Sequence, residues 1–399
     1  MLNLPGGWLG MLALALSAAQ ASAQTPAARV DQLIVEARTA RERGNFADYL
    51  RRVRELASAM PGHPSMRFSL ARALALNGRA AESVGELRRL ASEGFAYDPA
   101  ADPGFEALGG EPAFSEAVRA LAANSAPRGA RPTAIIRLGL SGLQPEGVAA
   151  VGSGDFLAGS LAGDIFRFGP AGGAPVRVVA AGAMVAGVRV ERSGESFLAC
   201  VTNEGGGTAL VHRYRTSDGA LLAMYQLPAS RPFCNDIALI GDSGFAVTDS
   251  NNGAVYRVAG GRLRAMPVGP LFYPNGIAAD PEGGMLYVAH ADGIVAADLA
   301  TGIASPLAVT GTALGGIDGL AWHRDALIAV QNVTTPVRVL RITPRPDGTA
   351  EVETLLSGEP ALAGATTVAV AEGDAFVLSQ TGIPNGTPPD DPVLVRLPL

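Results

Sequence analysis

The fold of this chain is decided by three short segments, NDIALI (235–240), FAVTDS (245–250) and AVYRV (254–258). Each segment is rich in apolar, strand-forming residues, and clusters of Gly, Asp and Asn separate them. This pattern predicts short antiparallel strands joined by tight turns. The unit occurs six times after residue 132, and its copies are anchored by Gly147, Gly187, Asp236, Gly276, Gly319 and Thr367.

The six anchors are 40, 49, 40, 43 and 48 residues apart along the chain. Repeats of about 40–50 residues with several strands each are typical of β-propellers. We therefore predict a mainly β protein with a six-bladed β-propeller over residues 132–399. A further strand at 133–138 precedes the first repeat. We expect it to complete the last blade, because the ring must close without a free sheet edge.

A helical segment is predicted before the propeller. The motifs GNFA (44–47) and GRAA (78–81) lie 34 residues apart, and apolar residues follow both at helical spacing. A period of 34 is that of tetratricopeptide repeats, so we predict an α-helical, tetratricopeptide-like domain over residues 26–125. Two functions are open for it: a docking surface for a protein partner, or a cap that shields the propeller.

The first residues have the features of an export signal. An apolar run (8–19) is followed by ASA (21–23), the small-residue pattern of a signal-peptide cleavage site. We predict a signal peptide over residues 1–23 and a periplasmic or secreted mature protein without a membrane span. In an oxidising compartment Cys200 and Cys234 can form a disulfide, and two free thiols are the alternative.

Composition excludes several classes of function. The net charge of −6 argues against a nucleic-acid partner, since phosphate binding requires a basic surface. All 31 basic residues are Arg, so the chain has no Lys for a phosphate-binding loop or for Schiff-base catalysis. The four His do not form the HExxH pattern of zinc hydrolases.

The candidate chemistry lies where the first strand of each repeat begins. First strands line the central channel of a propeller, so residues at these positions converge on its mouth from different blades. Carboxylate and amide oxygens are the ligands that Ca²⁺ prefers, and Zn²⁺, Mn²⁺ or Mg²⁺ are alternatives. Ordinary turn formation by Asn-Gly and Asp-Gly is the competing interpretation. The predicted metal ligands are Glu146, Asn235, Asn275 and Asp318.

Second strands run back toward the same face, so we expect the residues at their ends to form the rim of a pocket. His290 ends one of these strands and is a candidate second base or hydrogen-bond donor to a substrate. The alternative for His290 is an ordinary polar residue at a strand end. The predicted substrate contacts are Asn235, Asp249, Gln331 and Asn332.

The same motifs give residues 132–399 a family resemblance. PEG (145–147), ND (235–236), PNG (274–276) and DG (318–319) occur in the order found in the senescence-marker-protein/gluconolactonase/luciferin-regenerating-enzyme family, which this part of the chain resembles. The resemblance implies a bound divalent metal. Its implied ligands are Glu146, Asn275 and Asp318, with Asn235 as a fourth ligand or a substrate contact.

The resemblance further implies hydrolysis of lactones or related small esters. In such a reaction the metal polarises the carbonyl group and lowers the pKa of a bound water, and Asp318 acts as the general base. The alternative is a non-catalytic propeller that binds a ligand or a protein, with the helical domain recruiting the partner.

Overall fold

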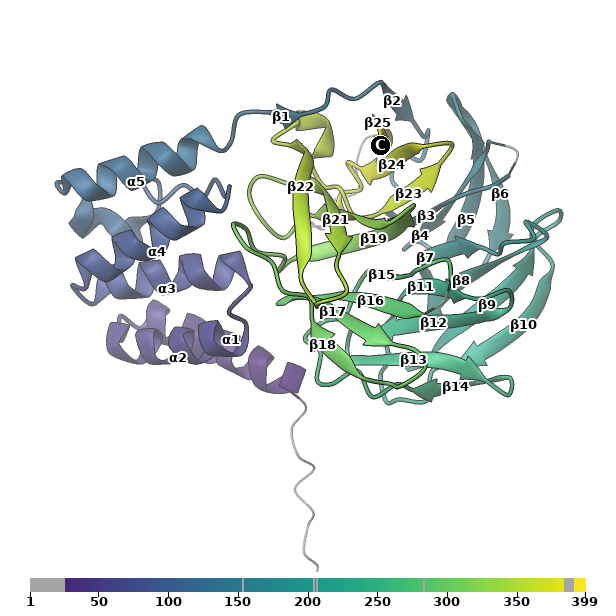
Figure 1. Ribbon diagram of the computed structural model, residues 1–399, viewed down its shortest axis with the longest axis horizontal. Coiled ribbons are helices and arrows are strands. Elements are labelled where there is room, and N and C mark those ends of the chain that lie inside the picture. The colour runs from purple at the N-terminus through teal and green to yellow at the C-terminus, as the bar shows by residue number, and fades with distance from the viewer. Residues whose placement is uncertain (1–25, 153, 204, 206, 283, 384–390) are drawn as a thin grey trace, which may run out of the picture.

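The computed structural model describes residues 26–152, 154–203, 205, 207–282, 284–383 and 391–399. The signal-peptide prediction for residues 1–23 lies outside these ranges. No helix within the described residues is long and apolar enough to cross a membrane. Figure 1 shows two parts, a stack of helices on one side and a ring of sheets beside it.

The helical segment is a series of helices that pack in chain order, α1 on α2, α2 on α3, α3 on α4 and α4 on α5. Leu50 and Val53 of α2 are buried, and so are Val84 and Leu87 of α4. Leu50 and Val84 are 34 residues apart, and so are Val53 and Leu87. The period predicted from the sequence therefore relates α2 to α4. The helices are α1 (Pro26–Glu42), α2 (Phe46–Ala59), α3 (Pro64–Leu76), α4 (Ala80–Ser92), the 3₁₀ helix η1 (Pro103–Leu108) and α5 (Pro112–Ala123).

Six antiparallel sheets form a propeller in the described part of the chain, as predicted. Blade 1 contains β3 (Pro145–Ala150), β4 (Phe156–Ser160), β5 (Asp164–Gly169) and β6 (Gly172–Ala180). Blade 2 contains β7 (Met184–Val190), β8 (Ser196–Thr202), β9 (Ala209–Arg215) and β10 (Leu221–Gln226). Blade 3 contains β11 (Cys234–Ile240), β12 (Gly244–Asp249), β13 (Ala254–Ala259) and β14 (Arg262–Ala265).

The second half of the ring continues this pattern. Blade 4 contains β15 (Ile277–Ala279), β16 (Met285–His290), β17 (Gly293–Asp298) and β18 (Ala304–Pro306). Blade 5 contains β19 (Ile317–His323), β20 (Ala326–Gln331), β21 (Arg338–Pro344) and β22 (Ala350–Ser357), followed by the 3₁₀ helix η3 (Pro360–Leu362). Blade 6 contains β23 (Val368–Ala371), β24 (Asp374–Ser379), β25 (Val393–Pro398) and the early strand β2 (Ala134–Arg137).

The early strand closes the ring. β2 pairs with β25, with Ala134 opposite Arg396 and Arg137 opposite Val393, so the predicted closure is confirmed. The two-residue strand β1 (Arg128–Gly129) adds a fifth strand to blade 5 by pairing with β22. The segment that joins the helices to the propeller is therefore fixed to a sheet edge rather than free.

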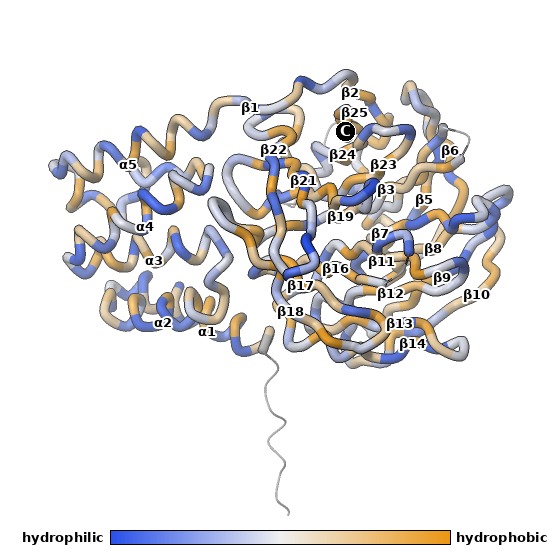
Figure 2. Tube along the Cα trace, in the orientation of Figure 1, coloured by the Kyte–Doolittle hydropathy of each residue, from blue (hydrophilic) through white to orange (hydrophobic). Residues whose placement is uncertain are grey.

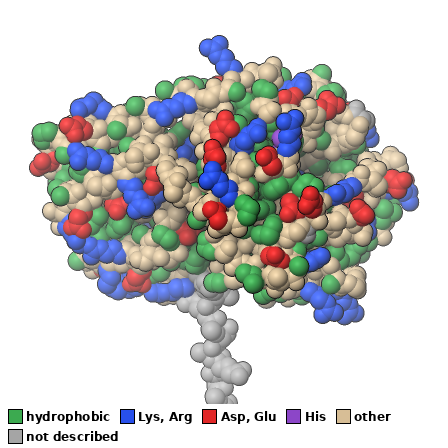
Figure 3. All heavy atoms as spheres, in the orientation of Figure 1, with side chains coloured by type: hydrophobic (Ala, Val, Ile, Leu, Met, Phe, Trp, Pro, Cys, Tyr) green, Lys and Arg blue, Asp and Glu red, His purple; other side chains and the backbone are tan. Residues whose placement is uncertain are grey.

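Aliphatic side chains fill the spaces between blades. Leu198 and Val211 of blade 2 pack against Ile237 and Phe245 of blade 3, and all four are fully buried. Figure 2 shows apolar residues recurring along the strands of the propeller. On the face drawn in Figure 3, Arg side chains are interspersed with Asp and Glu and form no large basic patch.

The first strands contact one another in a closed ring around the axis. Glycine is required where they meet, because a Cβ on Gly276 would lie 2.4 Å from the carbonyl oxygen of Asp318. A Cβ on Gly319 would lie 2.5 Å from the Cα of Thr367. Blades 3 and 6 depart from this rule and place Asp236 and Thr367 at the equivalent positions. The close approach of these strands leaves only a small central space for side chains.

The sequence allowed either a disulfide or two free thiols at Cys200 and Cys234, and the structure shows the disulfide. Cys200 of β8 and Cys234 of β11 are joined by an S–S bond of 2.06 Å between adjacent blades. Both residues are fully buried. The bond ties the start of β11, where Asn235 lies, to blade 2.

Candidate functional site

The start of the first strands forms a small central cavity at one end of the channel. Its volume is about 10 Å³, which is room for roughly one water molecule or ion. The structure therefore brings together all four predicted ligands, which come from blades 1, 3, 4 and 5. The residues with side chains in its lining are Glu146, Asn235, Asp236, Asn275, Asp318 and Thr367.

Glu146 enters the cavity from β3 with one unsatisfied carboxyl oxygen. Its Oε2 atom is buried and has no hydrogen-bond partner. Burial raises the pKa of Glu146 well above its usual range, and the nearby carboxylates of Asp318 and Asp236 raise it further. A buried carboxylate without a partner is energetically unfavourable unless it is protonated or binds a cation.

Asp318 enters the cavity from β19 and is held by two amides. Asn332 Nδ2 donates to Asp318 Oδ2 at 2.5 Å and also to the carbonyl of Ala365 at 2.8 Å. Burial raises the pKa of Asp318 to about 7, although hydrogen bonds from Asn332 and Asn275 act in the opposite direction. A carboxyl group with a pKa near neutrality can both accept and return a proton at physiological pH.

The cavity also contains a third carboxylate, Asp236, which sequence reasoning treated only as a strand anchor. Its side chain accepts hydrogen bonds from Arg189 Nη2 at 3.2 Å and from the backbone N–H groups of Ile237 and Ile277. Burial nevertheless raises the pKa of Asp236, against the effect of Arg189. The replacement of the expected glycine by an acidic residue in one blade was the available signal.

The two amides predicted as ligands are positioned by neighbouring hydroxyl groups. Asn235 Nδ2 donates to Ser250 Oγ at 3.0 Å, and Ser250 Oγ donates to the carbonyl of Pro274 at 2.7 Å. The engaged amide nitrogen leaves Oδ1 as the acceptor atom of Asn235. Thr248 Oγ1 donates to the carbonyl of Asn275 at 2.8 Å and so holds the main chain of the second amide.

Two of the predicted substrate contacts are internal to the protein. The Asp249 carboxylate accepts hydrogen bonds from Phe233 N and Asn252 Nδ2 and is fully buried. Gln331 is also fully buried, where Nε2 donates to the carbonyls of Ala313 and Gly315. The structure thus engages the side chains of Asp249 and Gln331 in internal hydrogen bonds, and their predicted role as substrate contacts finds no geometric support.

His290 lies apart from the central cavity. It ends β16 on the face that carries Val288, which packs toward blade 3, and its ring lines a second cavity beside the helical segment. Burial lowers the pKa of His290 to about 4, so the ring is neutral at pH 7. The structure therefore does not bring His290 to Asp318, and the second-base prediction finds no geometric support.

Oxygen atoms dominate the donor set of the central cavity. Within the described residues, no three His, Cys, Asp or Glu side chains form a group that could hold a metal ion. The predicted set does not require such a group, since it combines two carboxylates with two amides. Hard cations accept this combination, and the partnerless Oε2 of Glu146 fits a cation ligand.

The fold and the site define this chain as a six-bladed β-propeller with acidic and amide side chains at the mouth of its channel, preceded by a helical segment. No family model matches the chain, and no curated protein matches it. Solved structures show the fold. A candidate gluconolactonase superposes with a TM-score of 0.50 at 19% identity, covering 68% of this chain and 98% of that one.

Two further solved structures are similar to about two thirds of this chain. A candidate oxidoreductase (glucose dehydrogenase) from Thermus thermophilus has a TM-score of 0.49 and 18% identity, over 66% of this chain and 99% of that one. A virginiamycin B lyase from Staphylococcus aureus has a TM-score of 0.47 and 14% identity, over 67% and 99%. At these identities the likeness concerns the propeller fold, which the family resemblance of the sequence implied.

Proposed function

We propose that this protein is a metal-dependent hydrolase of lactones or related small esters. The observation that carries the proposal is the buried, partnerless Oε2 atom of Glu146. It faces a cavity that is shared with Asp318 and two amide side chains. The propeller of a candidate gluconolactonase supports the choice of substrate class.

The proposed cation is Ca²⁺, held by carboxylate oxygens of Glu146 and Asp318 and by the amide oxygens of Asn235 and Asn275. Two carboxylates balance the charge of a divalent ion. The third, Asp236, is already paired with Arg189. Zn²⁺, Mn²⁺ and Mg²⁺ are alternatives to be compared, although all-oxygen ligands favour the harder ions.

When bound, the cation supplies polarisation of the substrate carbonyl and acidification of a water molecule. Asp318 takes a proton from the attacking water, whose oxygen bonds to the carbonyl carbon. Asn332 holds Asp318 Oδ2 during this transfer. As the ring C–O bond of the lactone breaks, Asp318 returns the proton to the leaving alkoxide, which yields a hydroxy acid.

The size of the central cavity limits where the substrate lies. A space of about 10 Å³ admits an ion or a water molecule but not a lactone ring. The substrate must therefore lie above the cavity and present only its carbonyl group to it. Of the predicted substrate contacts, Asn235 lines the cavity itself, and Asn332, whose buried Oδ1 has no hydrogen-bond partner, donates to Asp318 of its lining.

The proposal is tested by calorimetry on chelator-treated protein, followed by a panel of lactones and esters. We expect one Ca²⁺ per chain, with binding and hydrolysis both abolished in Glu146→Gln and Asp318→Asn. The matched control is Asp298→Asn at the end of β17, where the carboxylate accepts hydrogen bonds from Ala300 N and Thr301 N of the following turn. Failure of all four cations to bind would exclude the site. Binding without hydrolysis would favour a non-catalytic ligand-binding propeller.

A further inference from the structure

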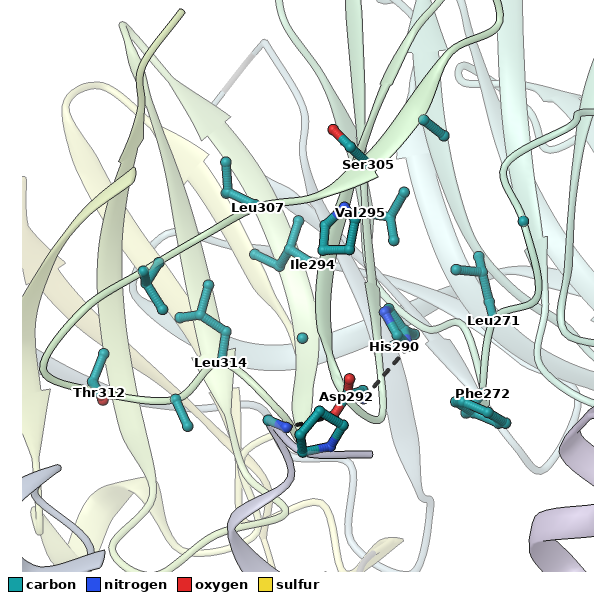
Figure 4. Close-up of a pocket in the computed structure, with 18 of the residues that line it drawn as sticks. Leu271, Phe272, His290, Asp292, Ile294, Val295, Ser305, Leu307, Thr312 and Leu314 are labelled. Atoms are coloured by element: carbon teal, nitrogen blue, oxygen red, sulfur yellow. Dashed lines mark hydrogen bonds between the residues drawn. The ribbon is translucent and has the colours of Figure 1, made fainter. Parts of the chain in front are cut away.

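A second and much larger cavity lies where the helical segment meets blades 3 and 4. Its volume is about 560 Å³, which is within the range of ordinary small-molecule sites. Figure 4 shows apolar side chains on two sides of it, with Leu307 and Leu314 on one side and Leu271 and Phe272 on the other. Walls of this kind can bury the hydrocarbon part of a ligand.

The charged side chains that line the cavity compensate one another. They are two arginines and two acids, Arg67, Arg89, Glu93 and Asp292. Glu93 accepts from Arg67 Nη1 at 2.8 Å and from Arg89 Nε at 3.2 Å. Burial raises the pKa of Asp292 to about 6, while the backbone N–H of Gly62 and the charge of Arg67 oppose this rise. The charges are therefore balanced, and the described lining offers no spare counter-ion to a charged ligand.

His290 contributes a neutral hydrogen-bond donor to the wall. Burial lowers the pKa of His290 to about 4, so the ring carries no charge at pH 7. The N–H of Asp292 donates to Nδ1 of His290 at 3.4 Å, which leaves the ring proton on Nε2. Among the residues that the structure describes, none accepts a hydrogen bond from Nε2. In Figure 4 the ring lies between the two apolar sides of the cavity, so its N–H is available to a ligand there.

We propose that this cavity binds an uncharged carbonyl compound with an apolar body, such as a ketone, an ester or an amide. The carbonyl oxygen accepts a hydrogen bond from Nε2 of His290, and the hydrocarbon part packs against Leu307 and Leu314. An ion of either sign would lose its hydration in the cavity without gaining a free counter-ion, which is unfavourable. The proposal is independent of the function proposed for the central cavity.

The test compares three probes of nearly equal size on the full chain by ligand-observed NMR at pH 7: cyclohexyl methyl ketone, 1-cyclohexylethylammonium and cyclohexanecarboxylate. We expect the ketone to bind about tenfold more tightly than either ion, because only the ions bear the cost of burying a charge without a partner. Equal binding of the three probes, tighter binding of either ion, or binding of none would overturn the proposal.

Two variants of His290 test the donor. His290→Leu removes the N–H group and should weaken the ketone by roughly fivefold, the usual contribution of one neutral hydrogen bond. His290→Gln retains an N–H donor and should keep most of the affinity. The matched control is His323→Leu, at the end of β19 and outside the cavity lining, which should leave affinity unchanged. Unchanged binding of the ketone to His290→Leu would refute the role of His290.

Two further variants test the location and the charge balance. Ser305→Trp places a large ring at an exposed position in the cavity wall and should weaken the ketone. Asp292→Asn removes one negative charge, so the affinity of the carboxylate probe should rise about threefold while that of the ketone stays unchanged. Asp318→Asn should retain ketone binding, which separates this site from the central one. Full affinity in Ser305→Trp, or no gain for the carboxylate in Asp292→Asn, would contradict the assignment.

Discussion

At the scale of single residues, Glu146 is a buried acid whose position opposes the stability of the fold. Its carboxylate is buried near Asp318 and Asp236, and Oε2 has no hydrogen-bond partner. Nothing in the fold requires an acid at this position, because the adjacent Gly147 makes the close contact with the next blade. A buried carboxyl group of this kind is tolerated when it is protonated or when it binds a cation, and the function proposed above requires the second.

Replacing Glu146 by Gln should therefore have opposite effects on stability and on cation binding. The amide retains the shape of the side chain and removes the repulsion from the neighbouring carboxylates. In the presence of a chelator we expect the melting temperature to rise by roughly 2–4 °C. The stabilisation by Ca²⁺ that we expect for the unmodified protein should disappear. Scanning calorimetry with and without Ca²⁺ measures both, and a variant less stable in chelator would contradict this account of Glu146.

Asp292 gives a pH-dependent prediction. Its pKa is raised from 3.8 to about 6, so the folded state holds the proton more tightly than the unfolded state. The contribution of this group to stability is therefore present below pH 4 and is lost as the pH rises through 6. Asp292→Asn keeps an acceptor for Gly62 N–H without the charge.

The test of this prediction compares the melting temperature of Asp292→Asn with that of the unmodified protein. The melting temperature of Asp292→Asn minus that of the unmodified protein should increase from pH 4 to pH 6.5 and then stay constant. Thermal denaturation across this range measures it. A difference that falls with rising pH would show that the carboxylate is stabilised as the anion.

The residues that sequence reasoning located correctly share one property, their place in the repeat. Glu146, Asn275 and Asp318 lie at or just before the start of a first strand, and this position alone brings them to the axis. Gln331 and His290 were assigned by position too, but their roles depend on side-chain direction and on partners from other segments. The second cavity could not be predicted, because the packing of the helical segment against blade 4 creates it.

At the scale of elements, the strands were predictable where apolar residues alternate clearly along the sequence. β2 was expected to pair with β25 because the ring needed a fourth strand in its last blade, and register confirms it. β1 was missed since two residues, Arg128 and Gly129, carry no periodicity and lie in a stretch with linker composition. Its pairing with β22 depends on a neighbour more than 200 residues away, which no local pattern encodes.

The disulfide between β8 and β11 should contribute measurably to the stability of the propeller. The bond closes a loop across 34 residues, for which loop entropy predicts about 3–4 kcal/mol. Replacing both Cys200 and Cys234 by Ala should lower the free energy of unfolding by about this amount, as measured by urea denaturation. Added reductant should destabilise the unmodified protein and leave the double variant unchanged. Equal stability of the two proteins without reductant would contradict the prediction.

At the scale of the whole molecule, the helical segment is joined to the propeller by main-chain contacts rather than tethered to it. Gly315 N donates to the carbonyl of Gly62 at 3.1 Å, and Ala96 N donates to that of Thr335 at 2.6 Å. Figure 1 shows the helices lying along blades 4 and 5. Of the two functions left open by the sequence, this arrangement favours a cap on the propeller.

Arg338 is the side chain through which the two parts are coupled. It is 3% exposed, donates to the carbonyl of Glu93 at 3.1 Å and to Gln331 Oε1 at 2.8 Å, and lies over the ring of Phe95. It begins β21, directly after the turn that carries Asn332. The helical segment, Arg338 and the Asn332–Asp318 hydrogen bond therefore form one connected structure.

Arg338→Ala should for this reason lower the stability of the whole protein and not only that of the contact between the helices and the propeller. Loss of a buried hydrogen-bond network predicts a fall of about 3 kcal/mol in the free energy of unfolding. Scanning calorimetry should show one transition in the unmodified protein and two in the variant, as the helices and the propeller begin to unfold separately. Arg345→Ala is the control, since its ion pair with Glu351 is exposed and contributes little. If Arg338→Ala unfolds in a single transition at an unchanged temperature, the two parts are not coupled through this side chain.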